Sequence, residues 1–529
     1  MPFLGLQGKR LLAGIACSAG MGFILFGYDN GVMGSVLGSD SFEAVFHLDS
    51  TMSGTVTAMF ELGCIIGALV VSLFGEPFGR RQVIQGGALL ICIGAAIQAS
   101  SYSSAQLIVG RIVAGAGMGF ITSMVPVWQA ETSPPNLRGA LVASSLSFVL
   151  LGQLIAYWSE YGTSAYASSF SWRFPFALQA VIAIILSLLL LVMPESPRWL
   201  FLHDQDEKAV EVLAALKGAD PTDEQTSAQA EEIRAAVILE ASIQKGWLDM
   251  FKNDGVHSRH RVLLSILVQF LQPFSGSAVI SYYQTVIFQS SIGMPRKEAQ
   301  LMSGYLSIWF LFASFLTWVL IERVGRRPLF LIFSVAMGCA MLVLAIMVKL
   351  ATHTSGIVAA VMIFLFEAFF TWGWQGNVWC YAAEIVPLEC RTKAMGLATG
   401  VQWTMNFLMI YVTPIGLANI GWKMYISELA PSFTMTFGQF TDNPVFACFN
   451  LAFFPVVYFL FPETGGLSLE LLDVVFMDDT TSPVKRAAEL QHKIKLGETV
   501  QFQNELEMCN AEIKGTVESV ENVEPNHLP

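Results

Sequence analysis

Twelve runs of apolar residues, each about long enough to cross a lipid bilayer, constrain the fold of this chain more than any other feature. A spanning helix takes about 20 such residues. Of the 529 residues, 54% are hydrophobic and only 13% charged, against about one quarter charged in soluble domains. A soluble enzyme is therefore excluded, and the sequence predicts an all-α membrane protein with twelve transmembrane helices. The predicted spans lie near 11–37, 54–74, 82–99, 106–128, 140–159, 174–193, 263–288, 301–321, 328–350, 357–380, 395–415 and 445–461.

The acidic residues are concentrated in two polar segments, 201–258 and 477–529, which together account for the whole net charge of −12. Acidic segments of this kind are typical of solvated or disordered chain, so we expect no nucleic-acid partner. The first segment contains AEEIRAAVILEASI at 230–243, whose apolar spacing predicts a short helix. The second has little periodicity and is predicted to be a disordered tail.

The positive charges predict how the chain is oriented in the membrane. An even number of spans places both termini on one side, and cytoplasmic loops carry the excess of Lys and Arg. Of 29 such residues, those in loops on the opposite side are only Arg173, Arg296, Lys297, Lys349 and Lys423. Both termini, the central segment and the tail are therefore expected in the cytoplasm.

Three short motifs occur twice, about half a chain apart. GEPFGRR at 75–81 matches IERVGRR at 321–327, ETSPPNLRG at 131–139 matches EIVPLECRT at 384–392, and PES at 194–196 matches PET at 462–464. Each pair follows the second, fourth or sixth span of its half, and parallel repeats build transporters from two bundles around a central site. We expect a six-helix bundle at 1–200, a cytoplasmic linker with short helices at 201–258, a second six-helix bundle at 259–476 and the acidic tail at 477–529.

The cysteines and histidines suggest neither a metal site nor an enzyme. Most cysteines lie in apolar runs, where a thiol behaves as a small hydrophobe, and none has the spacing of metal ligands. We expect free thiols, no metal and no cofactor. No Ser/His/Asp or Cys/His pattern is present to support catalysis.

Nine further motifs follow one another in an order that chance does not explain. They are FGYD at 26–29, FGRR at 78–81, GR at 110–111, P-x-W-x-x-E-x-x-x-x-x-x-RG at 126–139, PESPRWL at 194–200, ERVGRR at 322–327, EIVP at 384–387, QW at 402–403 and PETGGLSLE at 462–470. Over about residues 10–475 the chain resembles the sugar porter family of the major facilitator superfamily, and the fungal members are the most similar in style. The resemblance implies a multi-pass carrier of the plasma membrane that is not an enzyme.

Asp29 and Arg111 are the charged residues of greatest interest within the spans. An intramembrane carboxylate is costly and normally faces a cavity with a partner. Arg111 is the only cation deep in a span, so we expect the two to pair. The resemblance implies the same, because proton symporters of the family use a first-span Asp and a fourth-span Arg. Protonation of Asp29 would then couple a proton to the substrate; the alternative is a purely structural salt bridge.

The repeated GRR motifs resemble the cytoplasmic charge clamp of the superfamily, in which cations pair with acids and hold the outward-open state. The alternative is simple anchoring of positive charge on the cytoplasmic side. Glu76 and Pro77 depart from the family pattern, so the first clamp is expected to hold more loosely. The predicted gate residues are Arg80, Arg81, Glu131, Arg138, Glu322, Arg323, Arg326, Arg327, Glu384 and Arg391.

Sugar recognition needs side-chain amides that donate to and accept from hydroxyls, and aromatic faces that stack on a pyranose ring. A Trp in a span is also often an interface or packing residue. The residues that match the family's substrate site or its cavity lining are Phe26, Gly63, Gln153, Gln272, Tyr282, Trp379, Gln402 and Trp403.

The second half departs from the family pattern at several of these positions. Pro273 and Ala278 stand where members carry a second Gln and an Asn, and Phe310 aligns with another Asn. Gln375 adds an amide near the cavity and is included in the predicted substrate site. The departures favour a substrate other than glucose or a rebuilt pocket, unless Gln375 simply replaces the lost amides.

Two further acids lie within predicted spans. Glu61 could titrate or could hydrogen-bond across the first bundle, and we rank it below Asp29. Glu367 lies about two turns before Gln375.

The sequence therefore predicts a secondary active transporter that takes up a monosaccharide, an oligosaccharide or a related polyol together with a proton, by alternating access across the lipid bilayer. Three alternatives remain open. They are a facilitator without proton coupling, a carrier of a non-sugar polyhydroxy compound such as a cyclic acid, and a non-transporting sugar sensor. The short tail, which lacks repeats, disfavours the sensor.

Overall fold

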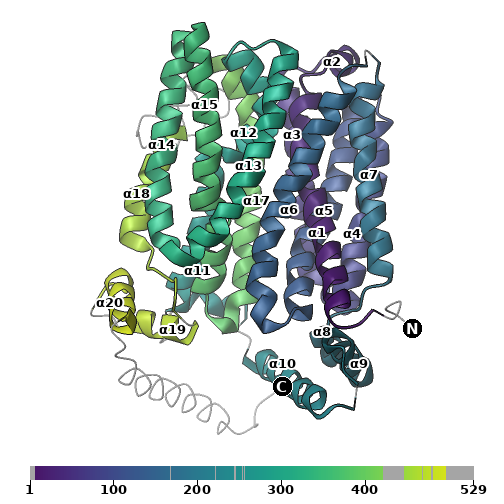
Figure 1. Ribbon diagram of the computed structural model, residues 1–529, viewed down its shortest axis with the longest axis vertical. Helices are drawn as coiled ribbons and strands as arrows, with labels where there is room; N and C mark the ends of the chain where they lie inside the picture. The colour runs from purple at the N-terminus through teal and green to yellow at the C-terminus, as the bar shows by residue number, and fades with distance from the viewer. Residues whose placement is uncertain are drawn as a thin grey trace, which may run out of the picture.

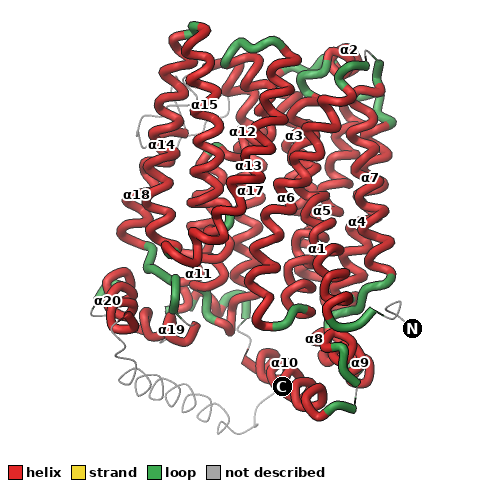
Figure 2. Tube along the Cα trace, in the orientation of Figure 1, coloured by secondary structure: helices red, strands yellow, loops and turns green. Residues whose placement is uncertain are grey.

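The computed structural model describes residues 6–166, 168–220, 222–243, 246–252, 254, 257–420, 446–467, 469–477 and 481–495. In this part of the chain all regular structure is helical, without any strand (Figure 2). The long helices stand side by side in two bundles, one from each half of the chain (Figure 1). The end that carries α8 (Pro197–Leu202) and α9 (Asp206–Lys217) is called the linker end here, and the end that carries α2 (Asp40–Phe46) the α2 end.

The first bundle contains six long, unbroken helices. Helix caps mark where two of them begin: Asp49 accepts from the Met52 N–H at 2.7 Å and Ser103 from the Gln106 N–H at 3.3 Å, as preferred N-cap residues do. The helices are α1 (Lys9–Val36), α3 (Ser50–Phe74), α4 (Arg80–Ala99), α5 (Ser104–Thr132), α6 (Pro135–Thr163) and α7 (Phe170–Leu191), with η1 (Glu76–Phe78) between α3 and α4.

Glycines allow these helices to pack at very short range. A Cβ atom on Gly27 of α1 would lie 1.7 Å from the carbonyl oxygen of Val149 in α6, which no larger residue could tolerate without moving the helices apart. Small residues are the usual means of close helix packing in membranes. Most buried apolar side chains of the first bundle form one cluster, which also includes Trp403 of the second half, whereas Ala58 and Leu150 belong to the cluster of the second bundle.

The second bundle has six corresponding crossings, two of which are broken. Its elements are α11 (Ser258–Leu271), η3 (Gln272–Ser275), α12 (Ser277–Val286), η4 (Ile287–Ser291), α13 (Arg296–Val324), α14 (Arg326–Leu350), α15 (His353–Phe370), η5 (Thr371–Gln375), α16 (Asn377–Ile385), η6 (Leu388–Cys390), α17 (Arg391–Ile420) and α18 (Phe446–Leu460).

The two breaks have local causes. In the first, Pro273 lies in the 3-10 turn η3, where it supplies no backbone N–H, and Gly276 adopts a φ of 92°. That value is in the left-handed region that glycine enters readily. In the second, the crossing passes through the single π-helical turn η5, a feature frequent at functional sites. Both breaks direct side chains toward the space between the bundles.

The predicted spans are found at the predicted places. Nine helical segments of the described residues are long and apolar enough to cross a membrane, and α6, α17 and the shorter α18 lie at the other three predicted spans. Large apolar side chains stay exposed on the outside of the bundles, as contact with lipid requires; examples are Leu69, Leu73, Leu188, Phe312 and Phe459.

The polar segments also contain helices. The linker forms α8, α9 and α10 (Glu224–Ile243), which lie below the first bundle in Figure 1. The prediction of a disordered tail from residue 477 is wrong for its first part, because α19 (Leu469–Met477) is followed by α20 (Pro483–Lys495). Ala487 and Leu490 bury one face of α20 in the second bundle's apolar cluster, and Gln491 donates to the Gly465 carbonyl at 2.6 Å. The rest of the predicted tail lies outside the described residues.

Candidate functional site

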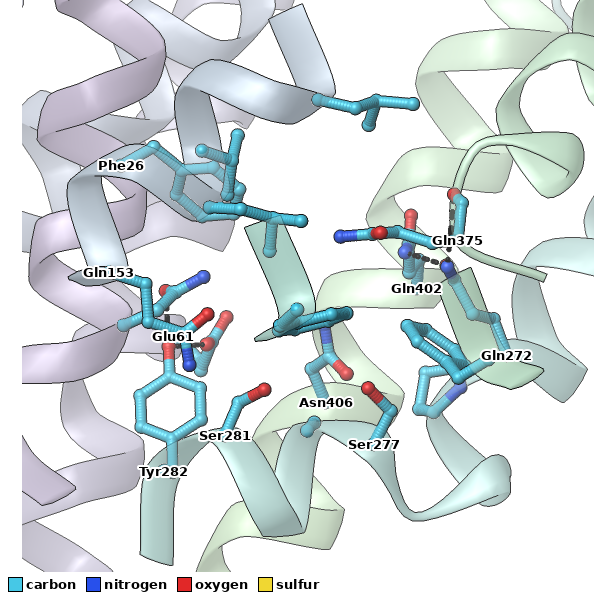
Figure 3. Close-up of a pocket in the computed structure, with 18 of the residues that line it drawn as sticks. Phe26, Glu61, Gln153, Gln272, Ser277, Ser281, Tyr282, Gln375, Gln402 and Asn406 are labelled. Atoms are coloured by element: carbon cyan, nitrogen blue, oxygen red, sulfur yellow. Dashed lines mark hydrogen bonds between the residues drawn. The ribbon is translucent and has the colours of Figure 1, made fainter. Parts of the chain in front are cut away.

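A cavity lies between the two bundles, with a volume of about 800 Å³ including its open mouth. Figure 3 shows side chains of both bundles pointing into it. Its lining is apolar on many sides and carries amides, hydroxyls and aromatic rings, as small-molecule sites do. It comprises Phe26, Asn30, Glu61, Leu146, Val149, Leu150, Gln153, Gln272, Pro273, Ser277, Ala278, Ser281, Tyr282, Phe310, Phe370, Gln375, Trp379, Gln402, Trp403 and Asn406.

Three predicted glutamines meet on the second-bundle side of the cavity (Figure 3). The Gln402 amide donates to Gln272 Oε1, and Gln272 Nε2 donates to the Gln375 carbonyl at 3.5 Å. These bonds orient the side-chain amides of Gln402 on α17 and Gln272 on η3, and the second bond reaches the main-chain carbonyl of Gln375 in η5. Gln402 Oε1 is buried and has no hydrogen-bond partner among the described residues, which leaves an acceptor for a ligand.

Aromatic side chains from both bundles close one part of the cavity. Phe26 of α1 and Trp403 of α17 contact each other edge to face, with ring centroids 5.5 Å apart. The Trp403 indole N–H is buried and unpaired among the described residues. Trp379 and Gln153 also line the cavity, as predicted.

A hydrogen-bonded group joins the bundles at the cavity wall. The Tyr282 hydroxyl of α12 lies 2.7 Å from Asn30 Oδ1 of α1 and 2.6 Å from Glu61 Oε1 of α3. Glu61, Asn30 and Asn406 line the cavity as well, although the sequence does not predict them as substrate-site residues. An acid within a span, such as Glu61, already indicates a functional position in the sequence. An Asn within a span does not indicate which face of its helix it occupies.

The predicted direct pair between Asp29 and Arg111 is not formed in this structure. Both residues are fully buried, but both Asp29 carboxylate oxygens lack a hydrogen-bond partner among the described residues. Arg111 instead donates from Nη2 to the Thr57 carbonyl at 3.3 Å, and its guanidinium lies over the Phe60 ring, 4.6 Å from the centroid. The pairing depends on how α1 and α5 are rotated, which spacing in the sequence does not determine.

Gly63 is not part of the cavity lining, contrary to the prediction. It faces α5, where an added Cβ atom would lie 2.4 Å from the Ile112 carbonyl oxygen. Its role in this structure is close packing within the first bundle. The three residues that depart from the family pattern, Pro273, Ala278 and Phe310, do line the cavity.

At the linker end of the first bundle, Arg80 and Glu131 form the predicted clamp. Arg80 Nε lies 3.1 Å from Glu131 Oε2, and Nη2 lies 3.3 Å from Oε1, so the pair is bidentate. Arg81 donates instead to the Met193 carbonyl at 2.9 Å.

The second bundle repeats this arrangement. Arg326 Nη2 donates to Glu384 Oε1 at 2.7 Å, and the Thr464 hydroxyl donates to the other carboxylate oxygen at 2.6 Å. Arg327 donates to the Tyr458 carbonyl at 2.9 Å. The second clamp therefore has one partner more than the first.

Two further glutamates, absent from the prediction, complete the clamps. Glu195 accepts from the backbone N–H groups of Arg80 and Arg81 at the start of α4, at 3.0 to 3.2 Å. Glu463 accepts from those of Arg326 and Arg327 at the start of α14, at 2.9 Å. Carboxylates are stabilised at helix N-termini. Both are the Glu of the repeated PES and PET motifs, whose positions in the sequence mark equivalent ends of the two halves.

Burial raises the pKa of the Glu195 carboxyl, and the N–H groups of Ser196, Arg81 and Arg80 lower it by a smaller amount. This carboxylate is therefore easier to protonate than an exposed one.

The other predicted gate residues lie at the same end but outside these pairs. Glu322 and Arg323 are exposed at the end of α13. Arg391 donates to the Val386 carbonyl at 3.2 Å. The Arg138 side chain lies outside the described part of the chain.

The sequence of residues 15–476 matches the family model described as sugar (and other) transporter. The chain belongs to this family. It is 32% identical to the sugar transporter STL1 of Saccharomyces cerevisiae, over 95% of this chain and 88% of that protein. It is 35% identical to the MFS-type transporter oryC of Aspergillus oryzae, over 89% of this chain and 86% of that protein.

The fold is that of the major facilitator superfamily. The xylose transporter XylE from E. coli, in its inward-open conformation, superimposes with a TM-score of 0.69 at 24% identity, over 88% of this chain and all of that one. The predictions of family, fold and a non-enzymatic membrane carrier are therefore confirmed.

Proposed function

We propose that this protein is a secondary active transporter of the plasma membrane that takes up a sugar or a related polyol together with a proton. The observation that carries the proposal is the cavity between the two repeated bundles, where three amides and two aromatic rings converge. A site at the interface of two repeats is what alternating access requires.

Unpaired polar groups in the cavity wall indicate the chemistry of the substrate. Gln402 offers an acceptor and Trp403 a donor, both buried and unpaired among the described residues. Buried polar groups normally have partners, and a hydroxyl can both donate and accept. A polyhydroxylated molecule satisfies both groups at once while its apolar face packs against the Phe26 and Trp403 rings.

The buried charges of the first bundle support proton coupling. Asp29 and Arg111 are fully buried, and an intramembrane ionisable residue is a functional candidate by default. A change in the protonation of Asp29 changes the charge that Arg111 must balance and thereby the preferred arrangement of α1 and α5. XylE, a protein of the same fold, is described in another solved structure as a proton:xylose symporter, which is consistent with this chemistry.

The clamps at the linker end support a gated cycle with this end in the cytoplasm. Positive charge gathers there, as the cytoplasmic side of membrane proteins requires. Release of Arg80 from Glu131 and of Arg326 from Glu384 would free α3–α4 and α13–α14 to move as the bundles rock.

Uptake by cells that lack their own carriers tests the proposal. The cells receive labelled hexoses, pentoses, disaccharides, polyols or cyclic acids while the external pH is recorded. Entry of a sugar or polyol with external alkalinisation is expected. Entry without a pH change would leave a facilitator, entry of a cyclic acid alone would replace the substrate class, and no entry would favour a sensor.

A further inference from the structure

Glu61 contributes a buried carboxyl group to the cavity wall. Among the described residues that line the cavity it is the only Asp or Glu, and it is 1% exposed. Oε1 contacts the Tyr282 hydroxyl, whereas Oε2 is buried and has no hydrogen-bond partner among the described residues. A buried carboxylate oxygen without a partner is costly, so this atom needs a proton or a ligand.

The number of hydrogens at the Tyr282 hydroxyl also bears on the protonation of the Glu61 carboxyl. A phenol hydroxyl has one hydrogen, yet Tyr282 Oη is within hydrogen-bond distance of two acceptor oxygens, Glu61 Oε1 and Asn30 Oδ1. The contacts are satisfied in two ways. Either Glu61 carries a proton and donates to Tyr282, which donates to Asn30, or the Asn30 amide is turned, donates from Nδ2, and Tyr282 donates to an ionised Glu61.

The two arrangements use the same side-chain positions and differ by one proton on Glu61. Since the assignment of an amide's O and N follows from its hydrogen-bond network, the charges around the network decide between them.

Charge counting at the centre of the first bundle decides the number of protons. Asp29 on α1, Glu61 on α3 and Arg111 on α5 are all buried. One guanidinium balances one carboxylate, and an unbalanced buried charge is strongly unfavourable. Two carboxyls beside one Arg therefore hold one proton between them.

The remaining neighbours do not change this count. Tyr28 on α1, Tyr282 and Tyr283 on α12 and Cys64 on α3 are neutral in their ordinary protonated forms. Glu160 on α6, the third buried acid among the described residues of this bundle, interacts with Tyr28 and Tyr157. α17, which also packs against α3, carries no ionisable side chain between Lys393 and Tyr411.

We propose that Asp29 and Glu61 share one proton beside Arg111, and that Glu61 is the carboxyl through which this proton is exchanged with the substrate cavity. This proposal rests on the proposed function and deepens it. Asp29 does not line the cavity, whereas Glu61 does. When the proton leaves Glu61 for cavity water, two carboxylates remain beside one guanidinium and the cluster carries one net negative charge, which a proton returned from cavity water to Glu61 neutralises.

Glu61 also links the proton to the substrate and to the movement of α12. Tyr282 lies on the segment that follows the break at Gly276, and its hydroxyl ties this segment to α1 and α3. A substrate hydroxyl that takes the place of Tyr282 at Glu61 would release α12 from the first bundle. One carboxyl would thus respond to substrate, proton and the position of α12.

Infrared difference spectroscopy of the purified, lipid-reconstituted protein during a rise in pH tests this without any substrate. The wild type is expected to lose a protonated-carboxyl band. Glu61→Gln and Asp29→Asn should each remove this band, because the remaining carboxylate is balanced by Arg111. Glu61→Asp should restore it, and Tyr282→Phe should shift its frequency by removing a hydrogen bond.

The controls separate the possible failures. Glu367→Gln, which removes a buried carboxyl of the second bundle, should leave the band in place. A band that survives Glu61→Gln would place the proton on another carboxyl and overturn the proposal, as would a wild type without the band. Failure of every sugar and polyol to enter cells would instead overturn the proposed function and leave the infrared result standing.

Discussion

The two bundles share their repeat motifs and differ in how they hold polar groups. The first crosses in six unbroken helices and buries Asp29, Glu61 and Arg111. The second also buries charged groups, Glu367 and Arg261, but it breaks two of its crossings, at η3 and η5, and presents amides at or beside each break. Unbroken helices keep all backbone N–H and C=O groups paired. A buried charged side chain in such a bundle therefore has few unpaired backbone groups near it. Broken helices supply backbone carbonyls and turned side chains to a cavity. The proposed function assigns proton handling to the first bundle and substrate recognition mainly to the second.

The linker ends of the bundles, by contrast, are nearly identical. Gly79 and Gly325 have φ values of 82° and 97°, and a Cβ atom on either would lie 2.6 or 2.9 Å from the carboxylate of Glu195 or Glu463. Duplication has thus preserved the clamp while the centres diverged.

The largest effect expected from the difference between the bundles is that of Asp29→Asn on the accumulation of substrate. Accumulation of substrate above its external concentration should disappear, because one ionisable member of the proton pair is gone. Exchange of labelled for unlabelled substrate should persist, since no cavity-lining residue is changed. Uptake and counterflow in the same vesicles provide the measurement, and accumulation that survives would assign coupling elsewhere.

Gln402→Ala tests the substrate side. Loss of a buried amide from a hydroxyl costs about 1–3 kcal/mol, or roughly 5- to 150-fold in affinity. Kd is measured on purified protein, with Gln85→Ala as the matched control, because Gln85 donates to the Ser187 carbonyl within the first bundle. Equal affinities for wild type and Gln402→Ala would remove Gln402 from the site.

Gly63→Ala tests whether the first bundle is a packed support. The added methyl group would meet the Ile112 carbonyl oxygen, and overpacking costs about 1–3 kcal/mol. The melting temperature should fall, whereas Gly86→Ala should leave it nearly unchanged, because nothing lies within 4 Å of a Cβ atom there. If Gly63→Ala lowered substrate affinity without loss of stability, the result would support the sequence-based prediction that Gly63 lines the substrate cavity.

The smallest effect is expected from the difference between the two clamps. Glu384 binds Arg326 and Thr464, whereas Glu131 binds Arg80. Glu384→Gln should therefore open the linker end more than Glu131→Gln, by about 1 kcal/mol or less. Labelling of Gly400→Cys, at a position open to space, measures this as a rate difference of a few fold. A larger rate with Glu131→Gln would reverse the order of clamp strength.

The sequence predicts the spans well because hydropathy alone determines where a chain can cross a membrane. It does not predict the breaks, since Gln272–Ser275 and Thr371–Gln375 lie inside apolar runs and turn for local reasons. Eight of the nine residues predicted for the substrate site line the cavity, including Gln272, Gln375 and Gln402.

The errors concern which way a residue faces. Gly63 carries no side chain to mark its direction, and the Asp29 to Arg111 contact depends on small rotations of α1 and α5. Glu195 and Glu463 were recoverable from the repeated PES and PET motifs, because an acid at equivalent ends of both bundles has an equivalent partner.

The most direct test of the account is accumulation in vesicles that contain the purified protein and carry an imposed pH gradient, acidic outside. The substrate found in the uptake panel is expected to accumulate inside, to collapse to equal concentrations when a protonophore is added, and to equilibrate without accumulation in Asp29→Asn and Glu61→Gln. Equal internal and external concentrations in the wild type, with or without the gradient, would contradict proton coupling and leave a facilitator.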